Sequence, residues 1–96
     1  MVKDDILLAL RSHLAEIRAF GVIHVAVFGS VARGESSAGS DVDILVQFDH
    51  PVGLFAFARL QRYLEELLGR SVDLVTPGAI RPEMREAVLS EAVYAG

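Results

Sequence analysis

The sequence has no cysteine, and this excludes disulfide bonds and thiolate-bound metal sites. It also has no apolar run of membrane-spanning length, and the apolar stretch 6–10 is too short even for the core of a signal peptide. Internal repeats, low-complexity segments and linker-like stretches are missing as well. These absences predict a cytoplasmic protein without membrane attachment, in which residues 1–96 form a single domain.

Positive charge is in short supply. Thirteen Asp and Glu residues outnumber nine Lys and Arg residues, which gives a net charge of −4 and a pI near 5.2. A domain that coats nucleic acid is normally basic, so direct nucleic-acid binding is not expected. The apolar fraction, 52%, is high for so short a chain. A rich core explains that fraction about as well as a surface that meets a partner does.

Hydrophobic periodicity predicts alternating helices and strands. Helices are expected at 4–20, at 52–68 and from Pro82 to about Ser90, and strands at 22–28, 41–48 and 71–75. Gly21 and Gly69 are placed to end the first two helices. The order helix, strand, strand, helix, strand, helix predicts an α/β (α+β) fold, a small mixed β-sheet backed by helices.

Two aspartates, Asp41 and Asp43, open the second expected strand. Residues two apart on a strand project from the same face, so these carboxylates lie close together. Like charges this close repel unless a cation compensates them, and oxygen ligands beside phosphates favour Mg²⁺. Taken alone, such a pair is more often the ordinary polar face of a strand.

A third acid, Asp73, lies between apolar residues on the third expected strand. If that strand pairs beside the second, Asp73 reaches the same point as Asp41 and Asp43. Three carboxylates could then hold two metal ions about 4 Å apart, the spacing used in two-metal phosphoryl transfer. Alone, Asp73 would be assigned to an ordinary surface position.

A Gly-Ser turn follows the first expected strand. Gly29 lets the backbone approach a ligand closely, and a short helix beginning near Ser30 would offer a backbone N–H and a hydroxyl to phosphate oxygens. Arg33, one turn later, could reach the same phosphates and neutralise charge on a leaving pyrophosphate. A simple turn is the plain alternative. The segment is not a P-loop, because no Gly-Lys-Ser/Thr occurs in the sequence.

These features are far more specific together than apart. They are Gly29-Ser30, Arg33-Gly34 and Ser40-Asp41-Val42-Asp43, followed later by Asp73. The segment 29–46 resembles the signature of the DNA polymerase beta-type nucleotidyltransferase superfamily, and most of all its minimal members, the MNT proteins. The resemblance covers nearly the whole chain and implies a polymerase beta-like nucleotidyltransferase core.

The resemblance also implies a role for each matching residue. Asp41 and Asp43 match positions that bind both Mg²⁺ ions. Asp73 matches the acid that binds the catalytic metal and helps to deprotonate the attacking hydroxyl. Gly29 and Ser30 match positions that hold the nucleotide's phosphates. The implied reaction is in-line attack of an acceptor hydroxyl on the α-phosphorus of a nucleotide, taken to be ATP, with release of pyrophosphate. A structural hydrogen bond is expected of the serine that precedes the first acid, Ser40.

Minimal members of this superfamily resemble antitoxins that pair with a helical HEPN protein, a ribonuclease toxin. The implied activity is adenylylation of a tyrosine on that partner, within a hetero-oligomer. One residue is compatible with such a partner, because helical periodicity places Phe55 beside Arg59 and Arg62, off the apolar stripe. The alternative is that Phe55 precedes the regular helix or covers a sheet edge.

Three interpretations of the function stay open. The first is a metal-dependent enzyme that modifies a HEPN-type toxin. The second is a non-catalytic antitoxin that inhibits its partner by occlusion, and the third is a small-molecule or nucleic-acid-end nucleotidyltransferase that works with a separate acceptor-binding chain. A degraded site usually loses an acid or the Gly-Ser pair, and neither is lost here, which favours an enzyme.

Overall fold

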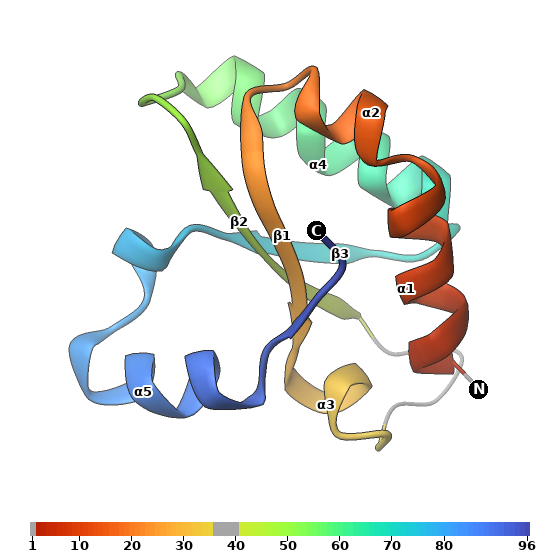
Figure 1. The fold of residues 1–96 in the computed structure, drawn as a ribbon. Coiled ribbons are helices and arrows are strands. Elements are labelled where there is room, and N and C mark those ends of the chain that lie inside the picture. The colour runs from red at the N-terminus through yellow and green to blue at the C-terminus, as the bar shows by residue number, and fades with distance from the viewer. Residues whose placement is uncertain (1, 36–40) are drawn as a thin grey trace.

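The computed structural model describes residues 2–35 and 41–96. Its strands are β1 (Val22–Phe28), β2 (Val42–Phe48), β3 (Val72–Val75) and β4 (Val93–Tyr94). They form a mixed sheet in the order β3-β2-β1-β4 (Figure 1). β1 is antiparallel to β2 and to β4, whereas β2 and β3 are parallel. The third strand therefore pairs beside the second, which is the condition under which Asp73 was expected to reach Asp41 and Asp43.

Helices cover the two faces of this sheet unequally. They are α1 (Val2–Ser12), α2 (Leu14–Arg18), α3 (Gly29–Ala32), α4 (Leu54–Leu68) and α5 (Pro82–Glu91), with a 3-10 turn η1 (Pro77–Ala79). α1, α2 and α4 lie together on one side of the sheet, and α5 lies on the other (Figure 1). The predicted fold class, a small mixed sheet backed by helices, is confirmed.

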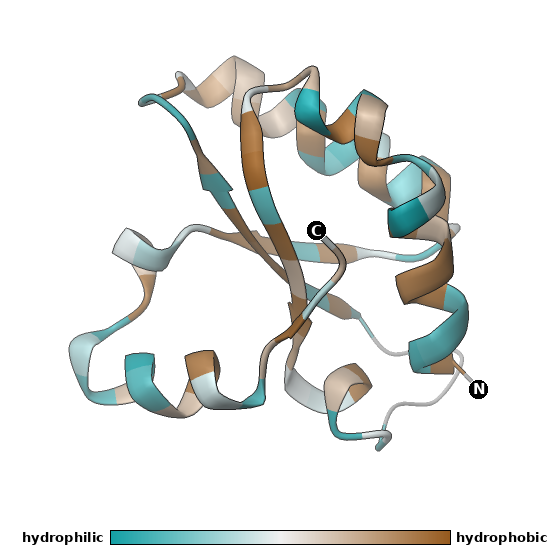
Figure 2. Ribbon diagram, viewed as in Figure 1, coloured by the Kyte–Doolittle hydropathy of each residue, from teal (hydrophilic) through white to brown (hydrophobic). Residues whose placement is uncertain are grey.

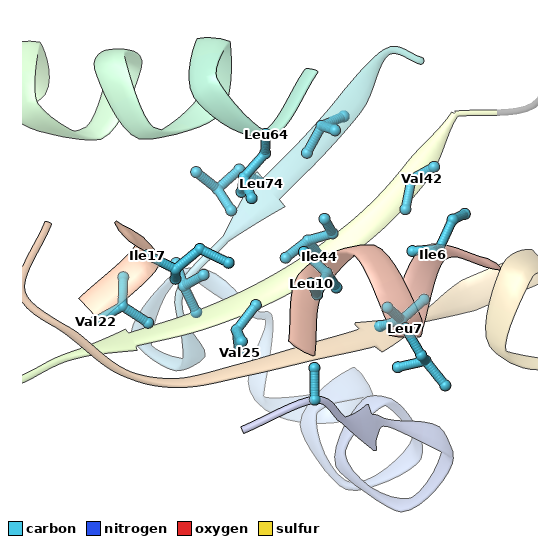
Figure 3. Close-up of a cluster of buried hydrophobic side chains, with 14 of the residues drawn as sticks. Ile6, Leu7, Leu10, Ile17, Val22, Val25, Val42, Ile44, Leu64 and Leu74 are labelled. Atoms are coloured by element: carbon cyan, nitrogen blue, oxygen red, sulfur yellow. The ribbon is translucent and has the colours of Figure 1, made fainter. Parts of the chain in front are cut away.

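The main hydrophobic core lies between the sheet and the layer of α1, α2 and α4 (Figure 3). Alternation along β2 sends Val42, Ile44 and Val46 into this core, where they meet Leu10 of α1 and Leu64 of α4. Each of these five side chains is completely buried. Burying one such side chain stabilises the fold by about 1.5–3 kcal/mol. Alternating brown and teal bands along α1 and α4 reflect helices with one buried face (Figure 2).

The opposite face of the sheet carries Asp43 together with a few apolar side chains. Asp43 and Leu45 alternate with the core residues of β2, so they project toward the side on which α5 lies. Ala26, Leu45 and Val88 are buried outside the main core, which indicates a smaller apolar contact beneath α5. This partly covered face presents the aspartate at the start of β2.

The expected helix 4–20 is wrong in one respect, because it is interrupted at His13. This residue has φ −122° and ψ 24°, outside the helical region, and separates α1 from α2. The His13 ring nitrogen Nδ1 lies 3.0 Å from the carbonyl oxygen of Ala9, and the His13 backbone N–H bonds instead to Leu10 O. The His13 side chain thus occupies the carbonyl oxygen that would accept the regular helical hydrogen bond. No proline or glycine in the sequence indicates this break.

Other differences concern the ends of elements. Leu54, expected on the apolar stripe of the second long helix, is 79% exposed in the first turn of α4. The buried face of that helix instead centres on Leu60 and Leu64. β4 and η1 were not expected, because two or three residues are too few to show a period. Across the described ranges, no helix has both the length and the apolar character that a membrane crossing requires.

Candidate functional site

Asp43 and Asp73 are direct neighbours across two strands. The parallel register of β2 and β3 pairs Val42 with Val72 and Asp43 with Asp73. Asp41 lies just before β2 and is exposed, as is Asp73, whereas Asp43 is half-buried. The sequence expectation that Asp73 would lie next to the aspartate pair of the second strand therefore agrees with the sheet register.

The electrostatics of Asp43 follow from this placement. Burial raises the pKa of the Asp43 carboxyl, and the charges of Asp73 and Asp41 raise that pKa further. A hydrogen bond with Asp73 acts in the same direction, whereas the nearby charge of Arg33 lowers the pKa of Asp43. The site is thus short of positive charge where its carboxylates meet.

The acids fit a divalent cation in their chemistry but do not form a finished ligand set. Within residues 2–35 and 41–96, no three Asp, Glu, His or Cys side chains are already arranged to hold a metal ion. Uncompensated carboxylates repel, so some separation is expected before a cation binds. All of the donors are carboxylate oxygens, the ligands that Mg²⁺ prefers, and Asp43 lies where added positive charge would be favourable.

Gly29 packs its backbone directly against Asp43. It follows Phe28, which pairs with Asp43 across β1 and β2, and it opens α3 with φ +71°. A Cβ atom at this position would collide with Asp43 Oδ2 and lie 3.0 Å from its Cγ. Gly29 was expected to let the backbone approach a ligand; what the structure shows is its close approach to a site carboxylate. α3 is the short helix expected after the Gly-Ser turn, and half-buried Ser30 is its second residue.

Arg33 is engaged by two glutamates. Its Nη1 donates to both carboxylate oxygens of Glu91, at 3.2 and 3.1 Å, and its Nε donates to Glu35 Oε1 at 3.2 Å. Hydrogen bonds to Glu35 and Glu91 raise the pKa of Arg33, which keeps the guanidinium charged. The side chain remains 45% exposed beside the turn. If Arg33 binds phosphates as expected, it does so while part of its guanidinium is bonded to Glu35 and Glu91.

A family model described as a nucleotidyltransferase domain matches residues 9–95, a range that includes the turn and all three aspartates. The chain belongs to this family. Protein adenylyltransferase MntA of Thermococcus cleftensis is 45% identical over 92 residues, which cover 95% of this chain and 93% of that relative. The resemblance inferred from the sequence motifs is thereby confirmed, and so is the assignment to the nucleotidyltransferase enzymes.

Solved structures share the fold of this nucleotidyltransferase. The structure of a proposed minimal nucleotidyltransferase, 45% identical, superimposes with a TM-score of 0.78 and covers 91% of this chain and 90% of that one. A toxin–antitoxin crystal structure with AMP-PNP gives a TM-score of 0.73 at 20% identity, over 90% and 72% of the two chains. A tri-AMPylated Shewanella oneidensis HEPN toxin in complex with its MNT antitoxin gives 0.68 at 18% identity, over 94% and 71%.

Glu91 is a further residue of this nucleotidyltransferase site that the sequence motifs do not indicate. Besides holding Arg33, its Oε1 accepts a hydrogen bond of 2.9 Å from the Gly29 backbone N–H. One weak signal was available, because Glu91 is the last residue of α5, where the helix dipole disfavours a negative charge. An acid at a helix C-terminus indicates a compensating partner, but the sequence does not identify that partner.

Two further expectations concern residues around the nucleotidyltransferase site. Ser40, for which a structural hydrogen bond was expected, lies outside the described residues. Phe55 lies within α4 and is 82% exposed, so it neither precedes the helix nor covers a sheet edge. It lines a shallow surface hollow with Ala58, Arg59 and Arg62. Its predicted place off the apolar stripe is confirmed, whereas a role in partner binding stays a prediction.

Proposed function

We propose that this nucleotidyltransferase transfers AMP from ATP to a tyrosine hydroxyl of a HEPN-type ribonuclease toxin and acts as its antitoxin. The observation that carries the proposal is the alignment of Asp43 with Asp73, with the Gly29 turn packed against Asp43. Relatives lend support, since one is named a protein adenylyltransferase and a fold neighbour is an MNT antitoxin bound to an AMPylated HEPN toxin.

The acidic residues supply the metal ligands in this proposal. Asp41 and Asp43 would hold two Mg²⁺ ions, with Asp73 as a ligand of the catalytic one. Bound Mg²⁺ would screen the triphosphate and stabilise the charge that develops during transfer. The raised pKa of Asp43 supports the assignment, because burial and the charges of Asp73 and Asp41 raise it, and a bound cation would offset both effects.

The turn and α3 would hold the leaving group. The Ser30 backbone N–H and hydroxyl are proposed to bind phosphate oxygens, and Gly29 is proposed to keep the turn close to Asp43. Arg33 is 45% exposed and lies beside the turn, so its guanidinium can neutralise charge on the pyrophosphate. Of its donors, Nε and Nη1 bond to glutamates, and Nη2 takes no part in these contacts.

The proposed transfer forms one bond to phosphorus, breaks another and moves one proton. The acceptor oxygen forms a bond to the α-phosphorus while the bond from that phosphorus to the pyrophosphate oxygen breaks. The hydroxyl proton passes to Asp73, which stands across from Asp43 and is exposed to solvent, so the proton can then be released. Positioning and charge neutralisation, rather than a covalent enzyme intermediate, account for the catalysis.

The HEPN-type partner is proposed to dock in part through the first turns of α4. Leu54 and Phe55 are 79% and 82% exposed there, and Phe55 is flanked by Arg59 and Arg62. Exposed aromatic side chains beside arginines are common anchors of protein interfaces. We place the complex in the cytoplasm, where ATP and the RNA cleaved by such a toxin are both present.

Ribonuclease activity of the partner tests this function. A HEPN-type protein, tested as the proposed partner, would be incubated with Mg²⁺, with or without ATP, and with wild-type protein or the Asp41→Asn/Asp43→Asn variant, and then separated and assayed. We expect lasting silencing only with ATP and wild-type protein. Equal silencing by the double variant would instead show occlusion without catalysis. Transfer of AMP only to a small molecule or a nucleic-acid end would refute the protein acceptor.

A further inference from the structure

A carboxylate from the end of the chain lies at the phosphate-binding turn. Glu91 Oε1 accepts the Gly29 backbone N–H at 2.9 Å, and both Glu91 oxygens lie within 3.2 Å of Arg33 Nη1. The Glu91 side chain is only 28% exposed. One residue of α5 therefore joins the first residue of α3 to the arginine that follows the helix.

This contact overcomes an unfavourable position. Glu91 ends α5, where the helix dipole and the unpaired carbonyl groups repel a negative charge. Hydrogen bonds that involve an ionised group are about twice as strong as neutral ones, and Glu91 accepts such bonds from both Gly29 and Arg33. The contact with the turn thus offsets the cost of an acid at this helix end.

Both partners of Glu91 also act on Asp43. The Gly29 backbone packs against the Asp43 carboxylate so closely that a Cβ atom would not fit. Arg33 supplies the positive charge that lowers the pKa of Asp43 against the effects that raise it. A shift of Glu91 would therefore also move the Gly29 turn and the Asp43 carboxylate beside it.

We propose that Glu91 is a positioning residue for nucleotidyl transfer, which holds the Gly29 turn and Arg33 in the arrangement that receives the β- and γ-phosphates. The inference rests on the proposed function and adds a residue to it. With Nη1 fixed by Glu91, the plane of the Arg33 guanidinium is held in one orientation. The opposite role would be inhibition, because a carboxylate in this place could compete with the phosphates for Arg33.

Equilibrium binding of nucleotides separates the two roles. Calorimetry in Mg²⁺ would compare wild-type protein, Glu91→Gln and the control Glu86→Gln, which removes the same charge from an exposed position on α5. We expect Glu91→Gln to weaken binding of ATP and of pyrophosphate about tenfold and to leave AMP binding within twofold, since AMP lacks the phosphates concerned. Glu86→Gln should match wild type for all three ligands.

A double-mutant cycle tests whether Glu91 acts through Arg33. If it does, Arg33→Gln/Glu91→Gln should bind pyrophosphate no more weakly than Arg33→Gln alone. Glu91→Asp keeps the charge and should fall between wild type and Glu91→Gln, which preserves the test if Glu91→Gln folds poorly.

Three outcomes of the binding measurements would contradict the positioning role, and a fourth would contradict the proposed function. Tighter pyrophosphate binding by Glu91→Gln would overturn the positioning role and show that Glu91 competes with phosphate. Unchanged binding, or an equal loss of AMP and pyrophosphate affinity, would overturn it as well. Wild-type protein that binds no ATP in Mg²⁺ would instead count against the proposed function itself.

Discussion

At the scale of single residues, the proposed chemistry depends on the surroundings of individual carboxylates. Asp43 is held half-buried between Asp73 on the next strand and the backbone of Gly29, and its pKa is raised as a result. A fold optimised only for stability would not place like charges opposite each other in a sheet. Such local frustration is typical of a functional site, where stability is given up for binding.

Asp43→Asn should therefore stabilise the metal-free protein. The folded-state pKa of Asp43 lies above its ordinary value of 3.8, so the folded form binds its proton more tightly and loses stability as pH rises through this interval. We expect the variant to gain a few tenths to about 1 kcal/mol in free energy of unfolding at neutral pH. The gain should vanish below pH 3.8, where both states are protonated. Thermal melting in chelator measures it.

The same variant should lose stabilisation by Mg²⁺. Wild-type protein should melt at higher temperature as Mg²⁺ is added, because the ion binds only the folded state, whereas Asp43→Asn should barely respond. Glu66→Gln, which removes an exposed charge on α4, is the matched control and should respond like wild type. A destabilised Asp43→Asn protein at neutral pH would contradict the proposed repulsion.

At the scale of elements, the junction of β1 and α3 builds the site. β1 ends at Phe28, and Gly29 turns the chain with a positive φ that other residues rarely adopt. The resulting short helix lies against the start of β2, so the proposed phosphate-binding groups and the carboxylates come from segments that are adjacent in space. The geometry of this junction depends on Gly29 for both its backbone angle and its lack of a side chain.

Gly29→Ala should accordingly do more damage than a change of backbone angle alone. Gly69→Ala at the end of α4 is the control, because Gly69 has φ +65° and its Cβ would meet nothing within 4 Å. Both variants should lose about 1–2 kcal/mol of stability from the left-handed conformation. Only Gly29→Ala should also displace Asp43 and lose most of its affinity for ATP in Mg²⁺. Equal nucleotide binding by the two variants, measured by calorimetry, would contradict this account.

Sequence patterns predicted the elements better than their contacts. The β-branched run 22–28 gave β1 its observed bounds, and the aspartates and the Gly-Ser turn indicated the site directly. The pairing of Asp43 with Asp73 needed the parallel register of two strands, which no local pattern determines. The contact of Glu91 with Gly29 joins residues 62 positions apart, and the break at His13 arises from one side-chain bond. Each of these depends on tertiary structure.

At the scale of the whole molecule, the proposed catalytic site and the proposed docking surface are separated. Asp43 lies near the start of β2. The end of this strand, Phe48, is five residues or about 17 Å further along, and α4 begins after it at Leu54. A partner that contacts both Phe55 and the acids must therefore span much of the sheet.

Phe55→Ser should weaken binding of the HEPN-type partner by about tenfold or more without changing the fold, because an exposed anchor contributes contacts only in the complex. Leu8→Ser is the matched control, since Leu8 is 65% exposed on α1. Titration of the purified partner by calorimetry measures both variants. Loss of binding by Leu8→Ser, with Phe55→Ser unaffected, would move the interface to α1.

The intact mass of the HEPN-type partner is the most direct test of the central claim, that Asp41, Asp43 and Asp73 beside the Gly29 turn form an AMP-transfer site. After incubation with ATP and Mg²⁺, we expect the partner to gain one or more AMP groups with wild-type protein and none with Asp41→Asn/Asp43→Asn. A partner that gains no AMP from wild-type protein, or gains it equally from the double variant, would contradict the claim.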